Sequence, residues 1–388
     1  MRNVPEQDRP ASGGRAAGMI MTLLLFLLII AVALFSYQRS LDPSVELKDL
    51  IKVLSSDGEK EVREAEVQYS FGFDAREKTV FAPYKELIVK CSKSGIMFLD
   101  KDGSIVRSEG IAFTNPMLKT NGAQLLAADI GSTEVYIFSN TSIAWQDKTD
   151  AAILNADISE DGYVTVITTA KRDNNVIRVY ESHGVELFRK IIANDFAVSA
   201  CVSPSEKYLT LSAISTGAVG PFSRLKFYDM EGKELAGLSF DTAGELLPLF
   251  WHNRDDSLFA AGDSAAGAVS PTGKMIWQEQ FTSIAGAGPA GDGMLAAAVQ
   301  TDEGVVLNIY TADGEKHASA ELQIIPAGLE AIKGRICVYS ENTVLFFDDR
   351  GNNTSKYHAG KKIRQVCLFG KNQAAVITDG EVTVLGIY

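Results

Sequence analysis

Short apolar runs and polar turns alternate along the chain from residue 65 to its end. β-branched and aromatic residues come in groups about as long as an ordinary strand, and Gly, Asp and Asn separate the groups. Runs of this kind, bounded by turn residues and lacking a helical period, are typical of β-strands. The pattern therefore predicts an all-β domain over residues 65–388.

One turn recurs within this domain at a period of about forty residues. It is four residues long, ends in Gly and separates two strand-like runs, as residues 100–103 separate GIMFL from SIVRSE. Gly tolerates the positive φ that such turns need. The turns end at Gly103, Gly184, Gly232, Gly273, Gly314 and Gly351, and residues 140–142 supply the member missing from the first, doubled interval.

Several short strands per unit at this period are the signature of β-propeller blades. Each unit reads as an inner strand, two middle strands, the glycine turn and an outer strand, which residues 152–191 show as ILNADI, YVTVITT, VIRVY and VELFRKI. The C-terminal unit has only three such runs, whereas the run at residues 66–73 precedes the first full unit at 80–110. We expect this N-terminal run to complete the last blade, because closure removes exposed strand edges. The prediction is a ring of eight four-stranded blades, with seven blades as the alternative.

A different pattern precedes the domain. Residues 16–38 carry no charge, and Met19 and Phe35 bound a stretch that is almost wholly apolar. Because about 20 residues of helix cross the hydrocarbon core of a bilayer, the sequence predicts a transmembrane helix over residues 19–37. Arginines precede it within residues 1–18, so the positive-inside tendency makes this short tail cytoplasmic and places the domain outside the cytoplasm.

Cleavage is the alternative for this segment. Ala31 and Ala33 fit the small-residue pattern of a signal-peptidase site, with cleavage after Ala33. However, Leu34 and Phe35 extend the apolar run beyond this site, and a run of this length is more typical of an uncleaved anchor. We therefore expect a single-pass protein of the cell membrane.

Residues 38–64 are predicted to form a stalk with a short amphipathic helix. Asp42 and Pro43 form a typical helix start, because Pro fits the first helical turn. The apolar residues that follow at helical spacing are Leu47, Leu50, Ile51 and Leu54. A spacer helix is the simpler interpretation, and a dimerising or membrane-surface helix is the alternative.

Charge and composition exclude two classes of function. The chain has 37 Lys and Arg against 49 Asp and Glu, a net charge of −12 without a long basic run, which argues against nucleic-acid binding. The four histidines and four cysteines are scattered, so no metal-ligand cluster is predicted. The cysteines in apolar strand-like runs, predicted to be buried free thiols, are Cys91, Cys201, Cys337 and Cys367. The last two fall in neighbouring blades, where an oxidising compartment could join them.

Residues 268–277 (AVSPTGKMIW) are similar to the A-x-D-x-x-T-G-K-x-x-W repeat of quinoprotein-like eight-bladed propellers, with Ser270 in place of Asp. Weaker copies occur at residues 229–235 and 100–105. The catalytic quinoproteins use an adjacent cysteine pair and a carboxylate-rich calcium site, whereas no two cysteines of this chain are adjacent. The resemblance therefore implies a noncatalytic use of the repeat, as in the propeller subunit of the outer-membrane assembly machinery. The whole layout resembles an uncharacterised family of bacterial, single-pass, propeller-like envelope proteins, which implies architecture and location only.

Three stretches are candidate sites. Residues 212–222 are predicted to be the longest Gly-rich insert between strands, and such inserts carry partner-binding surfaces. Residues 251–256 gather an aromatic ring, an imidazole and two acids without a nucleophile, so a strand end running into a turn is expected. Residues 286–291 match G-x-G-x-x-G, but no helix pattern follows, which favours a Gly-rich interstrand loop over a dinucleotide site. The candidate partner-binding residues are Ser215, Thr216, Gly217, Val219, Gly220, Phe222, Trp251 and His252.

The leading hypothesis is a noncatalytic binding or scaffolding module for a protein partner in the cell envelope. It includes no cofactor, metal or catalytic residue. A channel-site enzyme or small-ligand binder, for a quinone or a sugar, is the alternative. A third hypothesis is a purely structural subunit of a membrane complex, and the oligomeric state is left open.

Overall fold

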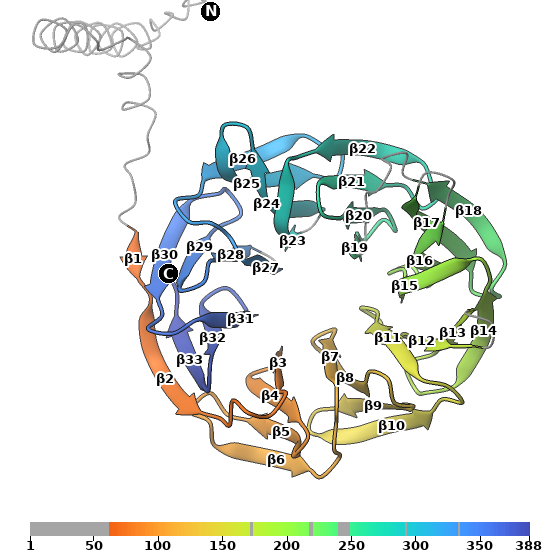
Figure 1. Cartoon of the computed structure of the whole chain (residues 1–388), viewed down its shortest axis with the longest axis horizontal. Helices are drawn as coiled ribbons and strands as arrows, with labels where there is room; N and C mark the ends of the chain where they lie inside the picture. The colour runs from red at the N-terminus through yellow and green to blue at the C-terminus, as the bar shows by residue number, and fades with distance from the viewer. Residues whose placement is uncertain (1–61, 171–173, 217–219, 240–248, 292, 333) are drawn as a thin grey trace, which may run out of the picture. The chain divides into compact units, whose positions relative to one another are not determined.

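The computed structural model describes residues 62–170, 174–216, 220–239, 249–291, 293–332 and 334–388. Every regular element in these residues is a β-strand. The strands form eight sheets around a central channel, which confirms the predicted eight-bladed β-propeller (Figure 1). The innermost strand of each blade lines the channel, and the outermost strand lies on the rim.

Blades 1 to 4 follow one another along the chain. Blade 1 contains β3 (Val80–Tyr84), β4 (Leu87–Ser92), β5 (Gly95–Leu99) and β6 (Ile105–Glu109), and blade 2 contains β7 (Pro116–Thr120), β8 (Gln124–Asp129), β9 (Glu134–Ser139) and β10 (Ser142–Lys148). Blade 3 contains β11 (Ile153–Ile158), β12 (Val164–Thr169), β13 (Asn175–Tyr180) and β14 (Glu186–Ile192), and blade 4 contains β15 (Asp195–Val202), β16 (Tyr208–Thr216), β17 (Pro221–Asp229) and β18 (Glu234–Ser239).

Blades 5 to 8 complete the ring, and blade 8 takes its outer strand from the other end of the domain. Blade 5 contains β19 (Leu249–His252), β20 (Leu258–Ala261), β21 (Ala265–Val269) and β22 (Met275–Gln280), and blade 6 contains β23 (Ser283–Gly291), β24 (Met294–Thr301), β25 (Gly304–Thr311) and β26 (Lys316–Glu321). Blade 7 contains β27 (Gly328–Ile332), β28 (Arg335–Tyr339), β29 (Thr343–Phe347) and β30 (Asn353–His358), and blade 8 contains β31 (Ile363–Phe369), β32 (Gln373–Thr378), β33 (Glu381–Gly386) and β2 (Glu66–Gly72).

The two faces of the ring carry different connections. Within each blade, neighbouring strands are antiparallel, so the glycine turns lie together on one face, here called the glycine-turn face. The hairpins between the second and third strands, and the starts of the inner strands, lie on the opposite face, here called the hairpin face. Each inner strand therefore runs from the hairpin face to the glycine-turn face.

Each predicted glycine turn packs against the preceding blade. Gly184 has φ +87°, and a Cβ atom there would lie 2.8 Å from the ring of Trp145 on the outer strand of blade 2. Gly314 has φ +92° and approaches Trp277 of blade 5 in the same way, at 2.6 Å. At the other turns, a different side chain on the outer strand of the preceding blade contacts the glycine. These pairs are Phe71 with Gly103, Phe188 with Gly232, Ala236 with Gly273 and Ala318 with Gly351. These contacts require a residue without a Cβ and with a positive φ, which explains the glycine period.

The N-terminal strand closes the ring, as the sequence predicted. Strand β2 pairs antiparallel with β33 as the outer strand of blade 8. Just before it, β1 (Arg63–Glu64) pairs in parallel with β30, so one segment joins the rims of blades 7 and 8. Buried Arg335 donates to the carbonyl oxygen of Tyr388 at 3.0 Å and to the hydroxyl of Thr354 at 2.6 Å, which ties the C-terminus to blade 7. The first strand of the described residues, β1, thus lies just before the predicted boundary at residue 65.

The hydrophobic core lies between the blades. Side chains of adjacent sheets interdigitate, as Leu126 and Ile137 of blade 2 do with Val164 and Val166 of blade 3. Cys337 packs at the interface of blades 7 and 8, whereas Cys367 packs with Phe81 at the interface of blades 8 and 1. Both are buried free thiols. Because they face different interfaces, they are not positioned to form a disulfide.

Two predictions about loops are wrong. Residues 212–222 are not a long insert, because β16 continues to Thr216 and β17 begins at Pro221, with these two residues as register partners. Residues 286–291 are not a loop but part of the inner strand β23, where a Cβ on Gly286 would lie 2.6 Å from the backbone nitrogen of Leu329. The glycine there permits the close approach of blades 6 and 7.

The predicted cytoplasmic tail, transmembrane helix and most of the stalk lie outside the described residues, whereas the stalk's last residues, 62–64, carry β1. The described residues contain no helix of the length and hydrophobicity that a membrane crossing requires.

The blade-to-blade contact predicts a specific effect of substituting Gly184. Gly184→Ala combines a positive φ with a clash against Trp145, and we expect it to lower the free energy of unfolding by about 2–4 kcal/mol. Gly131→Ala is the matched control, because Gly131 has φ +91° but open space around its Cβ position. The control should cost about 1–2 kcal/mol. Equal losses in urea unfolding would show that the contact with Trp145 contributes nothing.

Candidate functional site

The predicted partner-binding residues 215–222 lie at a hairpin on the hairpin face of blade 4. Ser215 pairs with Phe222, and Thr216 pairs with Pro221. Gly220 has φ +140°, and Thr216 is exposed. Gly217 and Val219 lie outside the described residues. The structure therefore brings together the ends of the predicted stretch.

Asp195 fixes the base of this hairpin. It is buried at the start of β15, accepts a hydrogen bond from the hydroxyl of Ser215, and forms an ion pair with Lys226 at 2.5 Å. Burial alone would raise the pKa of Asp195, but the hydrogen bonds from Lys226 and Ser215 outweigh it and hold the pKa below its usual value. The guanidinium of Arg224 lies over the ring of Phe222, 5.4 Å from its centroid. These contacts hold together the strands at the base of the hairpin.

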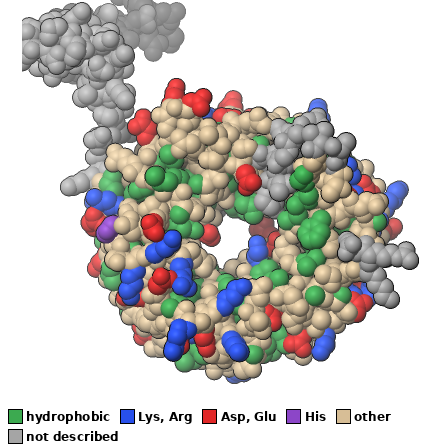
Figure 2. Space-filling view, viewed as in Figure 1, with side chains coloured by type: hydrophobic (Ala, Val, Ile, Leu, Met, Phe, Trp, Pro, Cys, Tyr) green, Lys and Arg blue, Asp and Glu red, His purple; other side chains and the backbone are tan. Residues whose placement is uncertain are grey.

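Two large apolar side chains are exposed on the hairpin face of blades 4 and 5. Phe196 is 53% exposed near the start of β15, and Leu249 is 48% exposed at the start of β19. Both lie where inner strands of adjacent blades begin, at the mouth of the channel. Figure 2 shows hydrophobic side chains gathered beside the channel mouth in this sector of the ring.

Trp251 and His252 do not belong to this surface. They end the inner strand β19, and the turn that follows confirms the predicted strand end. The Nε2 atom of His252 shares a hydrogen bond of 2.9 Å with the hydroxyl of Thr210, which lies five residues before Ser215 on β16, about 16 Å along a strand. Burial lowers the pKa of His252 to about 4, so the imidazole is neutral at physiological pH. The predicted set therefore splits into a hairpin and a separate channel site.

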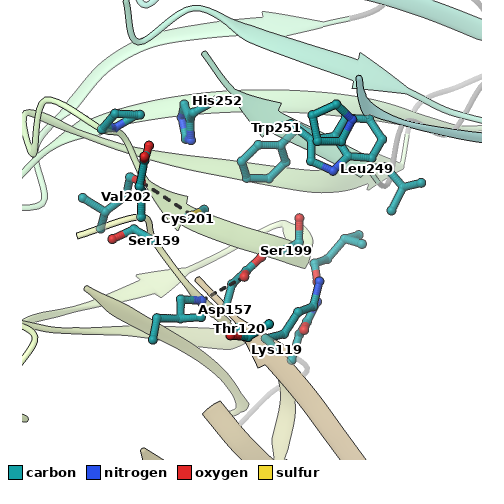
Figure 3. Close-up of a pocket in the computed structure, with 17 residues that line it drawn as sticks. Lys119, Thr120, Asp157, Ser159, Ser199, Cys201, Val202, Leu249, Trp251 and His252 are labelled. Atoms are coloured by element: carbon teal, nitrogen blue, oxygen red, sulfur yellow. Dashed lines mark hydrogen bonds between the residues drawn. The ribbon is translucent and has the colours of Figure 1, made fainter. Parts of the chain in front are cut away.

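Trp251 and His252 line a cavity of about 490 Å³ in the channel wall. Side chains of β19 lie on one side of it, those of β7 and β11 lie on the other, and β15 lies between them (Figure 3). The polar residues at its wall include Lys119, Asp157 and Ser199. Inner strands of four consecutive blades therefore build this cavity, together with Pro289 of a fifth.

The protein around the channel raises the pKa values of the acidic side chains that line it. Burial raises the pKa of Asp157, and Lys119 opposes this effect only in part. Glu330 on β27 has an exposed side chain, but the protein around the channel encloses it. This enclosure raises the pKa of Glu330 to about 7, although the positive charge of Lys119 acts to lower it. Burial also raises the pKa of the Cys201 thiol, so this thiol is protonated and a poor nucleophile at neutral pH. The positive charge of Lys119 therefore only partly offsets the effect of burial on the pKa values of Asp157 and Glu330.

The sequence prediction missed Lys119, Asp157 and Glu330. Each is a charged residue within a short, otherwise uncharged inner strand: PMLKT, ILNADI and GLEAI. A charge at such a position is a usable signal, because inner strands line the channel of a propeller. Among the described residues, no group of three or more His, Cys, Asp or Glu is arranged to hold a metal ion.

The sequence can now be compared with known proteins. The model of a family of unknown function, DUF5711, matches residues 58–387. The chain belongs to this family. Comparison with curated proteins finds no match.

Solved structures share the fold. The chain is similar to BamB from Moraxella catarrhalis, with 14% identity and a TM-score of 0.56, over 83% of this chain and 99% of that one. It is also similar to Sqt1 from Saccharomyces cerevisiae, with 10% identity and a TM-score of 0.63, over 84% and 100% of the two chains. The C-terminal WD40 domain of Sif2 matches with 11% identity and a TM-score of 0.59, over 84% and 99%. Identities this low establish the β-propeller fold alone.

The raised pKa of Glu330 predicts a pH-dependent effect of Glu330→Gln. The folded protein holds the proton of Glu330 up to about pH 7, whereas the unfolded chain releases it near the usual pKa of 4.5. Wild-type stability relative to the variant should therefore be greatest below pH 4.5 and decline as the pH rises towards 7. Urea unfolding of both proteins between pH 5 and pH 8 measures this difference.

The control is Glu303→Gln, at an exposed turn carboxylate between β24 and β25. It reports the effect of removing one surface charge. A Glu330→Gln difference that does not vary with pH, or that grows in the opposite direction, contradicts the proposed enclosure of Glu330.

Proposed function

We propose that this protein is a membrane-anchored, noncatalytic β-propeller outside the cytoplasm that binds a protein partner through the hairpin face of blades 4 and 5. The exposed pair Phe196 and Leu249 carries the proposal. Exposed apolar side chains that cluster on a rigid support are typical of protein-binding surfaces. The propeller fold supports the idea, because its rigid blades present loops and strand ends around a channel.

The surroundings of this pair suit a protein interface. Asp195, Lys226 and Ser215 hold the base of the neighbouring hairpin rigid, so little ordering is required on binding. Phe222 and Arg224 add an aromatic ring and a guanidinium beside it, and interfaces are enriched in both groups. Apolar residues on the rim, such as Ile191, are exposed on outer strands, away from the mouth of the channel.

The anchor is supported by the sequence. Residues 19–37 form an apolar segment of sufficient length to span, and the arginines before it favour a cytoplasmic N-terminus. The three arginines of residues 1–18 against Glu6 and Asp8 give that tail a net charge of +1, which leaves −13 for the part after the segment. An acidic domain of this kind is repelled by anionic lipid surfaces, so its partner surface stays accessible.

The partner-binding proposal is tested by site-specific photo-crosslinking in intact cells. A photoreactive residue at exposed Thr216 should give a discrete adduct with one envelope protein, whereas the same probe at Ile191 on the rim should not. Phe196→Ser combined with Leu249→Ser should lower the yield of the adduct at least about fivefold, because the apolar centre of the interface is lost. The single change Ile191→Ser is the matched control and should leave the yield unchanged. An adduct that survives the double change, or no discrete adduct at Thr216, refutes the proposed surface.

The anchor is tested by membrane extraction. The full chain should remain in the membrane fraction after washing with alkaline carbonate, whereas a chain that lacks residues 1–38 should be soluble. A protease added to intact cells, after removal of any outer envelope, should digest the propeller domain. Release of the full chain by carbonate contradicts the anchor, and full protection from the protease contradicts the orientation.

A further inference from the structure

The three tryptophans of the chain have different surroundings. Trp145 donates its indole N–H to the carbonyl oxygen of Ser182 at 3.0 Å, and Trp277 donates to that of Ala312 at 3.2 Å. Both form the blade-to-blade contacts described above. Trp251, by contrast, lines the channel cavity, and its indole N–H has no hydrogen-bond partner among the described residues. Trp251 is partly buried: it packs against the hydrophobic cluster between blades 5 and 6 and also lines the cavity.

Other polar groups at this cavity also lack protein partners within the described part of the chain. Asp157 accepts the backbone N–H of Ile158 at 2.8 Å through one oxygen, and its second oxygen has none. The ammonium of Lys119 and the hydroxyl of Ser199 likewise bond to no described residue. These groups come from three inner strands and line one space with Trp251 (Figure 3). The cavity thus offers both donors and acceptors beside an aromatic ring.

This combination selects among ligand classes. A phosphate or another anion needs donors alone and would be repelled by Asp157 and, across the channel, by Glu330. A quaternary or primary ammonium needs acceptors and would be repelled by Lys119. A quinone is flat and apolar with two acceptor oxygens, so it would leave the carboxylate of Asp157 without a partner. A ring that carries many hydroxyl groups satisfies donors and acceptors together, because each hydroxyl does both.

We propose that this channel cavity binds a neutral saccharide. Trp251 is the platform against which the apolar face of the sugar ring packs, and the carboxylate of Asp157 accepts hydrogen bonds from its hydroxyls. Lys119 and Ser199 donate to other hydroxyl oxygens of the sugar. A volume of about 490 Å³ lies within the range of small-molecule sites and suits one or two sugar units.

This site differs from the proposed partner surface, although Leu249 at the mouth of the channel also lines the cavity. Trp251 and Asp157 lie on the wall of the channel, whereas Phe196 and Leu249 are exposed at its mouth on the hairpin face. Phe196→Ser alone, at a residue that does not line the cavity, should therefore leave saccharide binding intact. Likewise, Asp157→Asn should leave the crosslinking at Thr216 intact.

The test is calorimetric titration of the full chain in a detergent without a sugar headgroup. The probes are glucose, galactose, N-acetylglucosamine, maltose, cellobiose and trehalose, with choline, inorganic phosphate and a short-chain quinone as the competing classes. We expect saturable binding of at least one saccharide and of none of the competing classes, together with a change in tryptophan fluorescence. No saturable binding by any of the six saccharides, or binding of a competing class in their place, overturns the proposal.

Two variants assign the binding to this cavity. Asp157→Asn keeps the shape of the side chain and should weaken the saccharide at least about tenfold, and Trp251→Leu should abolish binding. Glu303→Gln, on an exposed turn, is the control and should bind as the wild type does. Asp157→Asn is informative even if Trp251→Leu fails to fold, and each variant is first checked for a cooperative unfolding transition above the temperature of the titration. Wild-type affinity in folded Asp157→Asn overturns the assignment.

Discussion

The ring depends on one repeated contact, in which the outer strand of a blade packs against the glycine turn of the next. Trp145 on Gly184 and Trp277 on Gly314 are its largest forms, and each indole also donates to a carbonyl of the turn. The contact combines apolar packing, a hydrogen bond and a backbone conformation that favours glycine. Because every blade is held only by its two neighbours, this contact determines the angle between blades and hence the closure of the ring.

Closure requires a substitute for this contact where the chain ends. In blade 8 the outer strand is β2, paired with β33, and the backbone N–H of Tyr388 donates to the hydroxyl of Ser355 in blade 7 at 3.0 Å. Six blades are built from local hairpins alone, whereas blade 8 joins segments from opposite ends of the domain and blade 7 gains β1 at its outer edge. All eight outer strands also carry a β-bulge near their start, which bends the exposed edge and discourages pairing with other sheets.

The blades could be predicted from the sequence because each glycine turn needs a positive φ, and this local need recurs in blade after blade. Gly286 was wrongly predicted to lie in a loop, because a glycine in a strand cannot be told from a glycine in a loop by sequence alone. It is needed where the backbone of blade 6 approaches Leu329, which is distant along the chain. The candidate site was predicted only in part for a similar reason. Trp251 and His252 were recognised as unusual, but Lys119 and Asp157 join them only after the inner strands of separate blades meet around the channel. The spacing of these residues along the chain does not indicate that they lie close together.

The acids of the channel are the strongest argument that the ring does more than hold itself together. The channel wall raises the pKa of Asp157 and of Glu330, so each carboxylate at neutral pH costs folding free energy. Lys119 does not remove this cost, and uncharged residues at these positions would pack in the same inner strands without it. Stability alone therefore favours their absence. Groups that oppose folding and line a cavity are best explained by what they bind, because perturbed carboxylates concentrate at functional sites.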